Sequence, residues 1–332
     1  MRVLVFGGTG FIGSHVVRML VGREHRVSIV HRGETEVDLP ASVRHIHVPF
    51  DRLSNLRTWL GNETPQVVVD MVPYIDKRGH GVLHLRGVAE RAVVITSCDV
   101  YRAFGRLWRS EPGPPDPIPL AEDSPLRSRP APDSGREDAA FDNVEVERAV
   151  SRDAMLPVTI LRLPATHGPG DPQHRLWRYL KRMQDGRPAI VLEETHADWT
   201  WVRGYVENVA AAIALAAENP RATGRIYNVA EQTAYTEADW IRRIGAAVGW
   251  AGEVIAVPAD ALPEKLHQPY DFTQQYVVDS SRIRRELGYR EPVDEKDALL
   301  RTIEWELRNP PDSPLSGLDY VTEDSVIASA SD

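Results

Sequence analysis

The sequence predicts an α/β protein with a doubly wound parallel sheet of about seven strands and a smaller C-terminal lobe. Short runs rich in Val and Ile alternate with segments of helical periodicity through the first half, as expected for strands buried on both faces. The stretch GGTGFIG directly follows the first of these runs and opens a helical segment. The chain has 332 residues, of which 42% are hydrophobic, and this length suffices for a large core.

The elements follow from the same periodicities. The apolar runs predict seven strands, at residues 2–6, 26–30, 43–48, 66–71, 92–97, 158–163 and 225–230. Helices are predicted at residues 12–22, 53–61, 79–90, 142–153 and 206–218. In the less regular second half, Thr236 is a predicted N-cap, and the stretches DSSRIRRELGY and DEKDALLRTIEWELR predict two closing helices.

The bulk composition excludes several classes of function. The formal net charge is -9, and no basic stripe is visible, so nucleic acid is not an expected partner. The single cysteine, Cys98, excludes an intrachain disulfide and fits a reducing compartment. We see no signal peptide and no run long enough to cross a bilayer, so we expect a cytoplasmic protein without membrane contact.

The glycine-rich turn predicts a dinucleotide site. One glycine permits the tight turn, one lets backbone N–H groups approach a pyrophosphate, and one permits close packing of helix on strand. The helix that follows offers the positive end of its dipole to the phosphates. The predicted cofactor-binding residues of this turn are Gly7, Gly8, Thr9, Gly10, Phe11, Ile12 and Gly13.

The end of the second strand indicates which dinucleotide is bound. An NAD site usually has Asp or Glu there, but this chain has His31 and Arg32, with no carboxylate before Glu34. Arg32 could pair with a 2'-phosphate, so NADP is the predicted cofactor, with NAD as the alternative. Asp51 follows the third strand and could accept a hydrogen bond from an adenine amino group; a loop cap is the other interpretation.

The predicted strands and helices define the expected domains. Residues 1–165 form a predicted dinucleotide-binding Rossmann domain, to which helix 206–218 and strand 225–230 return. Residues 166–308 form mainly a substrate-binding lobe, interleaved with that domain, and residues 309–332 form a tail. The tail is rich in Pro, Ser and Asp, which indicates a surface strap or a loose end.

The chain resembles the short-chain dehydrogenase/reductase superfamily, in its extended, epimerase/dehydratase-like branch. The likeness covers nearly the whole length: GGTGFIG, TSCDVYR, LRLPATHGPGD and VENVAAAIALA are each similar to a family motif. It places Ser97 at the catalytic Ser/Thr, and it places Pro164 and His167 in the stretch beside the nicotinamide. The resemblance also implies a homodimer built from helices at about 79–90 and 142–153.

The sequence departs from this family at its Tyr-x-x-x-Lys pair. With Glu147 as the anchor after the pair, Asn143 falls on the Lys and Ala139 on the Tyr. If the alignment is shifted so that the nearest aromatic residue, Phe141, falls on the Tyr, then Glu145 falls on the Lys, and the pair is again absent. Phe cannot transfer a proton, and Asn143 could bond a ribose hydroxyl but supplies no charge.

Other polar residues could replace the pair. Ligands of such folds lie beyond the carboxyl ends of the strands, where this chain has Asp70, Tyr74, Ser97, Tyr101 and His167. His167 is the best general acid or base by its intrinsic pKa, and Ser97 could hydrogen-bond a carbonyl. Tyr101 and Asp70 are further catalytic candidates, although each residue also has a purely structural interpretation.

No metal site is expected. His80 and His84 are four residues apart on a predicted helix but lack the Glu of a zinc-protease motif, so surface histidines are the simpler interpretation. His45 and His47 alternate along a strand and share one face, which packing or edge exposure explains.

Two segments could contact the substrate. The proline-rich loop 110–135 leaves the carboxyl edge of the sheet and is either a lid over the substrate or a mobile insertion. Trp199, Trp201 and Tyr205 could stack on a flat ligand, or they could belong to the core beneath this loop.

Two classes of function remain. The first is an NAD(P)-binding oxidoreductase or epimerase/dehydratase-like enzyme for a small polar or nucleotide-linked substrate, with a non-redox isomerase, lyase or cyclase as its variant. The second is a non-catalytic binding scaffold for RNA or a protein partner. The intact glycine turn and Ser97 favour an enzyme, whereas the missing pair weighs against the usual chemistry.

Overall fold

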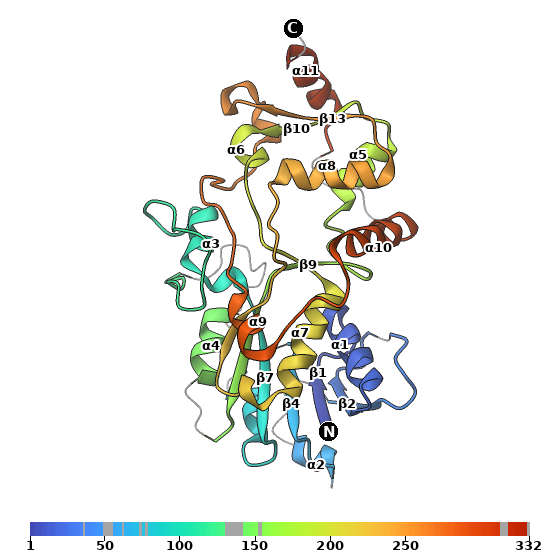
Figure 1. Ribbon diagram of the computed structural model, residues 1–332, viewed down its shortest axis with the longest axis vertical. Coiled ribbons are helices and arrows are strands. Elements are labelled where there is room, and N and C mark those ends of the chain that lie inside the picture. Colours follow the sequence, from blue (N-terminus) through green and yellow to red (C-terminus); the bar gives the residue numbers. More distant parts are fainter. Residues whose placement is uncertain are drawn as a thin grey trace.

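The computed structural model describes residues 1–35, 37–48, 56–61, 63–72, 75–76, 79–129, 142–151, 155–312 and 318–330, with the backbone alone at 75–76 and 79–81. The chain forms two lobes (Figure 1). The lobe with the N-terminus contains the large sheet, and the C-terminus lies at the far end of the second lobe. In the described part of the chain, no helix combines the length and the apolar character that a membrane span requires.

The large sheet has seven parallel strands, all of which the sequence predicted. They are β1 (Arg2–Phe6), β2 (Arg26–His31), β3 (Arg44–His47), β4 (Val67–Asp70), β7 (Arg91–Ser97), β8 (Val158–Leu163) and β12 (Ile226–Asn228). Their spatial order is β12-β8-β7-β4-β1-β2-β3, and every neighbouring pair is parallel. The order reverses between β1 and β4, so the crevice for a ligand is expected above the carboxyl ends of these two strands.

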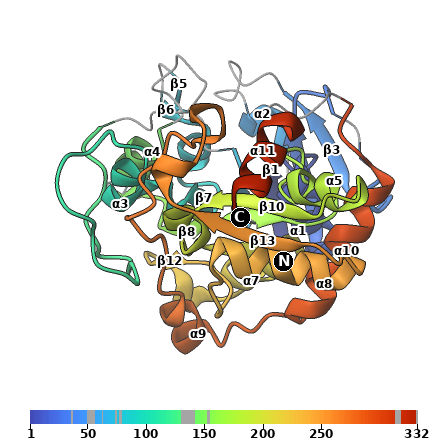
Figure 2. The same ribbon diagram turned by 90° about the horizontal axis from the view of Figure 1, so that it is seen from above.

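Helices cover both faces of this sheet (Figure 2). Alternate strand residues divide between two cores: Val3 and Val5 face one, whereas Leu4 and Phe6 face the other. Three helices cover the first core: α1 (Phe11–Gly22), α7 (Val206–Glu218) and α9 (Ser281–Leu287). The second core is covered by α2 (Leu56–Leu60), α4 (Asn143–Ser151) and the 3-10 helix Gly81–Leu85. Burial on both faces explains why the strands are continuous apolar runs.

The predicted helix at 79–90 is wrong. The chain instead forms β6 (Gly79–His80), which pairs with β5 (Ile75–Asp76), and the 3-10 helix Gly81–Leu85. Three glycines in this stretch, each costing about 1 kcal/mol in a helix interior, oppose an α-helix, and Gly87 takes a φ of +68°. The homodimer contact expected from this segment and α4 stays a prediction.

Outside the large sheet, the described residues form two small parallel strand pairs, and the second lobe has an apolar core of its own. β10 (Ala189–Glu193) pairs with β13 (Glu253–Val257), and β9 (Ala165–His167) pairs with β11 (Arg203–Tyr205). The helices are α3 (Arg102–Leu107), α5 (Trp177–Gln184), α6 (Glu194–Ala197), α8 (Glu237–Val248), α10 (Glu295–Arg308) and α11 (Tyr320–Ala330). The predicted cap of α8 is confirmed, because the Thr236 hydroxyl accepts from the Asp239 amide at 3.1 Å.

The interpretation of the C-terminal segment as a loose end is wrong, because α11 packs on the second lobe. Glu323 is 2% exposed, and Arg182 donates to its carboxylate, with Nε at 3.0 Å from Oε1. Val326 enters an apolar cluster with Val257 and Leu262. The buried ion pair of Glu323 with Arg182 and the burial of Val326 hold this helix on the second lobe. The segment is therefore a surface strap.

Candidate functional site

The glycine turn has the geometry that a dinucleotide requires. Gly7 takes a φ of +74°, which disfavours any other residue. A Cβ on Gly13 would lie 2.2 Å from the Gly7 carbonyl oxygen, and one on Gly8 would lie 2.7 Å from Ile29 Cγ2. These positions need glycine for the turn and for close packing of α1 on the sheet.

Gly10 differs from these glycines because its surroundings are open. A Cβ there would meet Gly7 O at 3.6 Å and nothing else within 4 Å. Gly10 is the N-cap of α1, and among the described residues no side chain caps this helix and no acid lies in its first turn. The amides at the start of α1 thus face the open side of the turn, and this arrangement fits a pyrophosphate.

The end of β2 carries the residues expected to distinguish NADP from NAD. His31 is 3% exposed, and its Nε2 lies 3.0 Å from His45 Nδ1. Arg32 is more than half exposed, and its Nη2 lies 2.6 Å from Glu34 Oε2. Thr9 Oγ1 lies 2.8 Å from Thr35 Oγ1, which joins the glycine turn to the loop after β2. Asp51 and Tyr74 lie outside the described residues.

The structure brings several predicted residues together in one cleft. The cleft has a volume of about 460 Å³ and lies at the carboxyl ends of β4, β7 and β8. Five predicted residues line it: Phe11, Ile12, Ser97, Asn143 and Pro164. The remaining lining residues come mainly from the same strand ends and from the loop before α5: Met71, Val72, Ile95, Thr96, Leu163, Thr166, Pro172, Gln173 and Arg175. This cleft is where a nicotinamide ring would reach from the glycine turn.

Ser97 and Asn143 are held by bonds to one turn. The Ser97 hydroxyl accepts from the Asp99 amide at 3.1 Å, which leaves its own proton for a ligand. Asn143 begins α4, and its Nδ2 donates to both oxygens of Asp99 at 3.0 Å. The residue at the Lys position is therefore fixed beside Ser97 but is uncharged. Ala139 and Phe141, the two residues considered for the Tyr position, lie outside the described residues.

Tyr101 belongs to a buried network and lines neither this cleft nor the second cavity described below. Its hydroxyl donates to Asn228 Oδ1 at 2.6 Å and accepts from Arg162 at 2.9 Å. Burial raises the pKa of this phenol far above its usual value. Arg162 also donates to both carboxylate oxygens of Glu147, at 2.9 and 2.7 Å. This placement favours a structural role for Tyr101, and it shows that Glu147 anchors α4 to the sheet.

Asp70 lies buried at the end of β4 and accepts from the Val72 amide at 3.1 Å. Burial raises its pKa to about 7, although the Val72 bond lowers it. A carboxyl group with this pKa can exchange a proton near neutral pH, yet Asp70 does not line either cavity. It supports the loop that contacts Gly7, since a Cβ on Gly7 would meet Val72 Cγ2.

We expect Asp70→Asn to remove part of the pH dependence of stability. The folded-state pKa of Asp70 is raised, so its contribution is present at acidic pH and is lost as the pH rises toward 7. The difference in free energy of unfolding, variant minus wild type, should grow by up to about 1.4 kcal/mol per pH unit between pH 4 and pH 7. Urea denaturation of both proteins across this range measures it, and parallel curves would contradict the prediction.

His167 borders a second cavity, and it is also held in place. Its Nδ1 lies 3.0 Å from Thr302 Oγ1, whose own proton goes to the Ala298 carbonyl at 2.7 Å. Nδ1 therefore carries the hydrogen, and the neutral ring has its lone pair on Nε2. Nε2 has no hydrogen-bond partner among the described residues, and Glu231 Oε1 lies 3.8 Å away. Burial raises the pKa of Glu231, but the positive charge of a protonated His167 and the Tyr205 amide lower it, and the pKa is lowered overall.

The second cavity has a volume of about 340 Å³ and is mainly aromatic. Trp199 and Trp201 stack with centroids 5.2 Å apart, and both line it, whereas Tyr205 does not. Most of its other walls were not expected from the sequence, and they come from α3 and its C-cap, α5, α6, β11, α8 and the segment before α9: Phe104, Leu107, Trp108, Arg178, Tyr179, His196, Arg203, Glu237, Trp240, Gln268, Tyr270 and Phe272. Single aromatic residues on amphipathic helices gave no signal that they would converge.

The two cavities adjoin. Gln173 and Arg175 line both of them, and both residues lie in the loop that follows His167. Arg175 Nη1 donates to the fully buried Asp171 at 2.5 Å, so this loop is braced. The two cavities therefore lie on either side of this loop.

The proline-rich loop adds no lining residue to either cavity over its described part, residues 110–129. Glu111 Oε1 accepts from the Ser128 amide at 2.6 Å, and Gln274 Oε1 accepts from the Asp116 amide at 2.6 Å. These two hydrogen bonds hold the loop in place, so its described part is not a mobile insertion. Residues 130–135 lie outside the described residues, and the lid stays a prediction.

The sheet order and the glycine turn define a dinucleotide-binding fold of the Rossmann class, to which a second lobe is added. The chain belongs to the NAD dependent epimerase/dehydratase family, which matches residues 3–230. This finding confirms the resemblance to the extended short-chain dehydrogenase/reductase branch, and it indicates a nicotinamide dinucleotide as the class of cofactor.

Named relatives agree with this family. The chain is 24% identical over 286 residues to 2'-dehydrokanamycin reductase of Streptomyces kanamyceticus, covering 85% of this chain and 75% of that protein. It is 25% identical over 334 residues to dTDP-glucose 4,6-dehydratase of Streptomyces griseus, covering 92% and 93%. The structure of dTDP-glucose 4,6-dehydratase from Bacillus anthracis in complex with NAD superposes with a TM-score of 0.68 at 15% identity, covering 93% of this chain and 97% of that one. At 15% identity, this superposition establishes a shared fold only.

Proposed function

We propose that this protein is an NADP-using enzyme of the epimerase/dehydratase family that binds a small polar, ring-shaped substrate in the aromatic cavity. The observation that carries the proposal is the meeting of two cavities at Gln173 and Arg175. One contains Ser97 and Asn143 beside the expected nicotinamide position, and the other contains His167. A carbonyl or hydroxyl carbon of the substrate at this junction would lie within reach of both.

In this proposal His167 moves the proton, because the family's Tyr has no evident counterpart. The bound cofactor supplies hydride chemistry. Thr302 holds the His167 ring in one tautomer, with the Nε2 lone pair available to accept a proton. The Glu231 carboxylate, 3.8 Å from Nε2, stabilises the imidazolium that forms. In alcohol oxidation Nε2 takes the proton of the substrate hydroxyl, and in carbonyl reduction the His167 imidazolium returns that proton to the substrate oxygen. Ser97 donates a hydrogen bond to the same oxygen and keeps its proton.

The cavity walls define the class of substrate. Trp199, Trp201 and Trp240 offer flat apolar faces, which suit one side of a sugar ring or another flat ring. Arg175 and Arg178 also line the cavity and can donate to hydroxyl, carbonyl or phosphate oxygens. A sugar, free or nucleotide-linked, meets both requirements, and the printed names of the relatives point to the same class.

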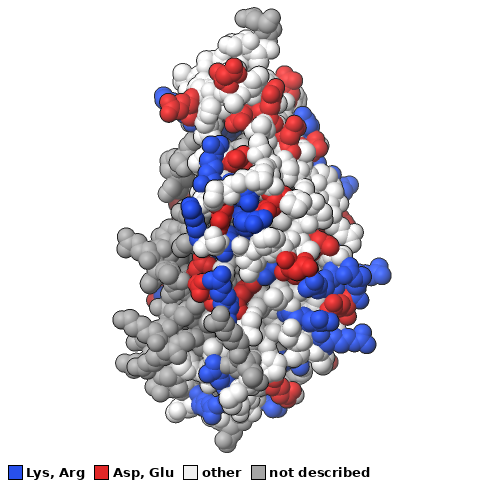
Figure 3. Space-filling model, turned by 90° about the vertical axis from the view of Figure 1, so that its left-hand side faces the viewer, with Lys and Arg blue, Asp and Glu red and all other residues white. Residues whose placement is uncertain are grey.

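A nucleic-acid scaffold is less well supported. The net charge is -9, and on the face drawn in Figure 3 basic and acidic side chains are interspersed. Binding to a phosphate backbone depends on clustered cations. A non-redox isomerase, lyase or cyclase would use the same two cavities, and it differs from the proposal in that no nicotinamide is oxidised or reduced during turnover.

Dinucleotide titration of the Gly10→Val variant tests the cofactor site. Gly10 has a φ of −76° and a ψ of 175°, which any residue adopts, and an added Cβ makes only an ordinary contact with the Gly7 carbonyl oxygen at 3.6 Å. The variant should fold normally and should bind NADPH more than about tenfold more weakly, a loss of 1.4 kcal/mol, because its side chain occupies the space of the pyrophosphate. Fluorescence titration of NADPH and NADH measures both affinities, and wild type should prefer NADPH.

The matched control is Gly22→Ala, at the other end of the same helix. A Cβ there has nothing within 4 Å, so affinity should equal that of wild type. Wild-type protein that binds neither dinucleotide would overturn the proposed function. Preference for NADH would overturn the choice of NADP and the role of Arg32, but not the assignment of a nicotinamide dinucleotide.

A further inference from the structure

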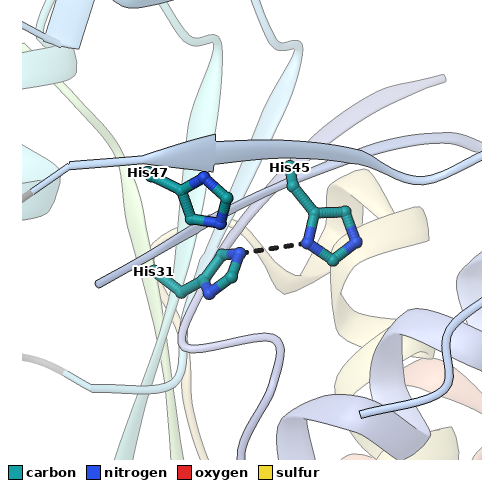
Figure 4. A group of neighbouring side chains, drawn as sticks. All are labelled: His31, His45 and His47. Carbon is teal, nitrogen blue, oxygen red and sulfur yellow. Dashed lines mark hydrogen bonds between the residues drawn. The ribbon is translucent and has the colours of Figure 1, made fainter. Parts of the chain in front are cut away.

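Three histidines converge on one face of the sheet edge, at the end of β2 and along β3 (Figure 4). His31 is buried, whereas His45 and His47 are exposed. Within the described residues this is the one group of at least three metal-ligating side chains that lie close enough to hold an ion. One ring nitrogen of each lies within 4.8 Å of the others.

Strand register explains the convergence. β2 and β3 pair in parallel, with His31 opposite His47 and Ile29 opposite His45. His45 and His47 are two residues apart, so they share a face, and the pairing puts His31 on that face too. The ring centroids of His31 and His47 lie 4.5 Å apart, and those of His31 and His45 lie 5.1 Å apart. The scaffold for all three ligands is thus the rigid sheet.

We propose that His31, His45 and His47 bind one divalent transition-metal ion of the zinc, nickel or copper class. A Zn–N bond of about 2.0–2.1 Å places two ligand nitrogens of a tetrahedral site about 3.3 Å apart. His31 Nε2 and His45 Nδ1 are 3.0 Å apart, and the wider spacings up to 4.8 Å close by small rotations of the exposed rings. Neutral imidazole nitrogen suits these metals, whereas magnesium and calcium prefer oxygen.

The site is open on its outer side. Three protein ligands leave at least one coordination position, and the exposure of His45 and His47 makes it available to water or to a ligand oxygen. Gly33 lies beside it, because a Cβ on Gly33 would lie 3.3 Å from His47 Cδ2. The adenosine ribose of a dinucleotide is held at the same strand end. The metal inference stands on the histidine geometry alone and does not depend on the proposed function.

Zinc titration of untagged, chelator-treated full-length protein tests the inference. We expect binding of one Zn²⁺ per chain by calorimetry, and visible absorption typical of tetrahedral Co²⁺ when Co²⁺ replaces it. In His45→Ala/His47→Ala the affinity should fall more than about 100-fold, since loss of a group that only orients a ligand already costs 10- to 100-fold. Both substituted residues are exposed, so the variant should keep its fold.

His267→Ala is the matched control, because His267 is exposed and lies outside the cluster. Its zinc affinity should equal that of wild type. Absence of stoichiometric zinc binding to wild type would overturn the inference, and so would equal affinity in the double variant. A wild-type protein that binds inorganic phosphate but not zinc would also overturn it. Dinucleotide titration is a separate measurement, so failure here is distinguishable from failure of the proposed function.

Discussion

Replacing Arg162 with methionine should lower the free energy of unfolding by about 3–5 kcal/mol, since it leaves the Glu147 carboxylate buried without its cation. Arg162 is 1% exposed and Glu147 is 4% exposed. The two make a bidentate pair, with N–O distances of 2.9 and 2.7 Å. In the variant, Glu147 would still accept a hydrogen bond from the Thr96 hydroxyl, which lies 2.9 Å away. The Tyr101 hydroxyl would lose the hydrogen bond that Arg162 donates to it. Urea denaturation followed by circular dichroism measures the loss.

Arg148→Met provides the comparison on the same helix. Arg148 pairs with Glu145 at 2.5 Å, but both side chains are about half exposed, so removing this pair should cost at most about 1 kcal/mol. The double variant Arg162→Met/Glu147→Leu should recover part of the loss, because it removes the unpaired charge. If Arg162→Met and Arg148→Met were equally stable, the proposed anchoring of α4 would be contradicted.

Replacing His167 with asparagine should lower kcat by a factor of about 10² to 10⁴, the range expected when a general acid or base is lost. The amide nitrogen of Asn can still donate to Thr302, so the variant should fold. Nucleotide-linked and free keto-sugars serve as the substrate panel, and NADPH consumption at 340 nm reports turnover.

Two comparisons separate catalysis from structure. NADPH affinity of the variant should stay within about twofold of wild type, because His167 borders the aromatic cavity and not the cofactor cleft. His25→Asn alters a histidine that pairs with Glu218 far from both cavities and should leave kcat unchanged. A His167→Asn protein with wild-type kcat would refute the assignment of the proton to His167.

Much of the fold could be predicted because its signals are local. The seven strands are apolar runs that must be buried on both faces, and Thr236 sits directly before a helical pattern. The prediction failed at 79–90, and for the tail it left a strap and a loose end as alternatives, of which the structure has the strap. Apolar spacing at 79–90 resembled a helix, but its glycines oppose one; the tail has a helix because Arg182 and the cluster around Val326 hold it.

The sequence by itself determined the glycine turn, the parallel sheet and the family, since each depends on neighbours along the chain. Only the tertiary structure decided which side chains meet. It buried Tyr101 between Arg162 and Asn228 and placed the two cavities next to each other at Gln173 and Arg175. It also surrounded one cavity with aromatic residues from five separate segments. It also added His31 to His45 and His47, because the register of two strands is set by long-range packing that no spacing along the chain reveals.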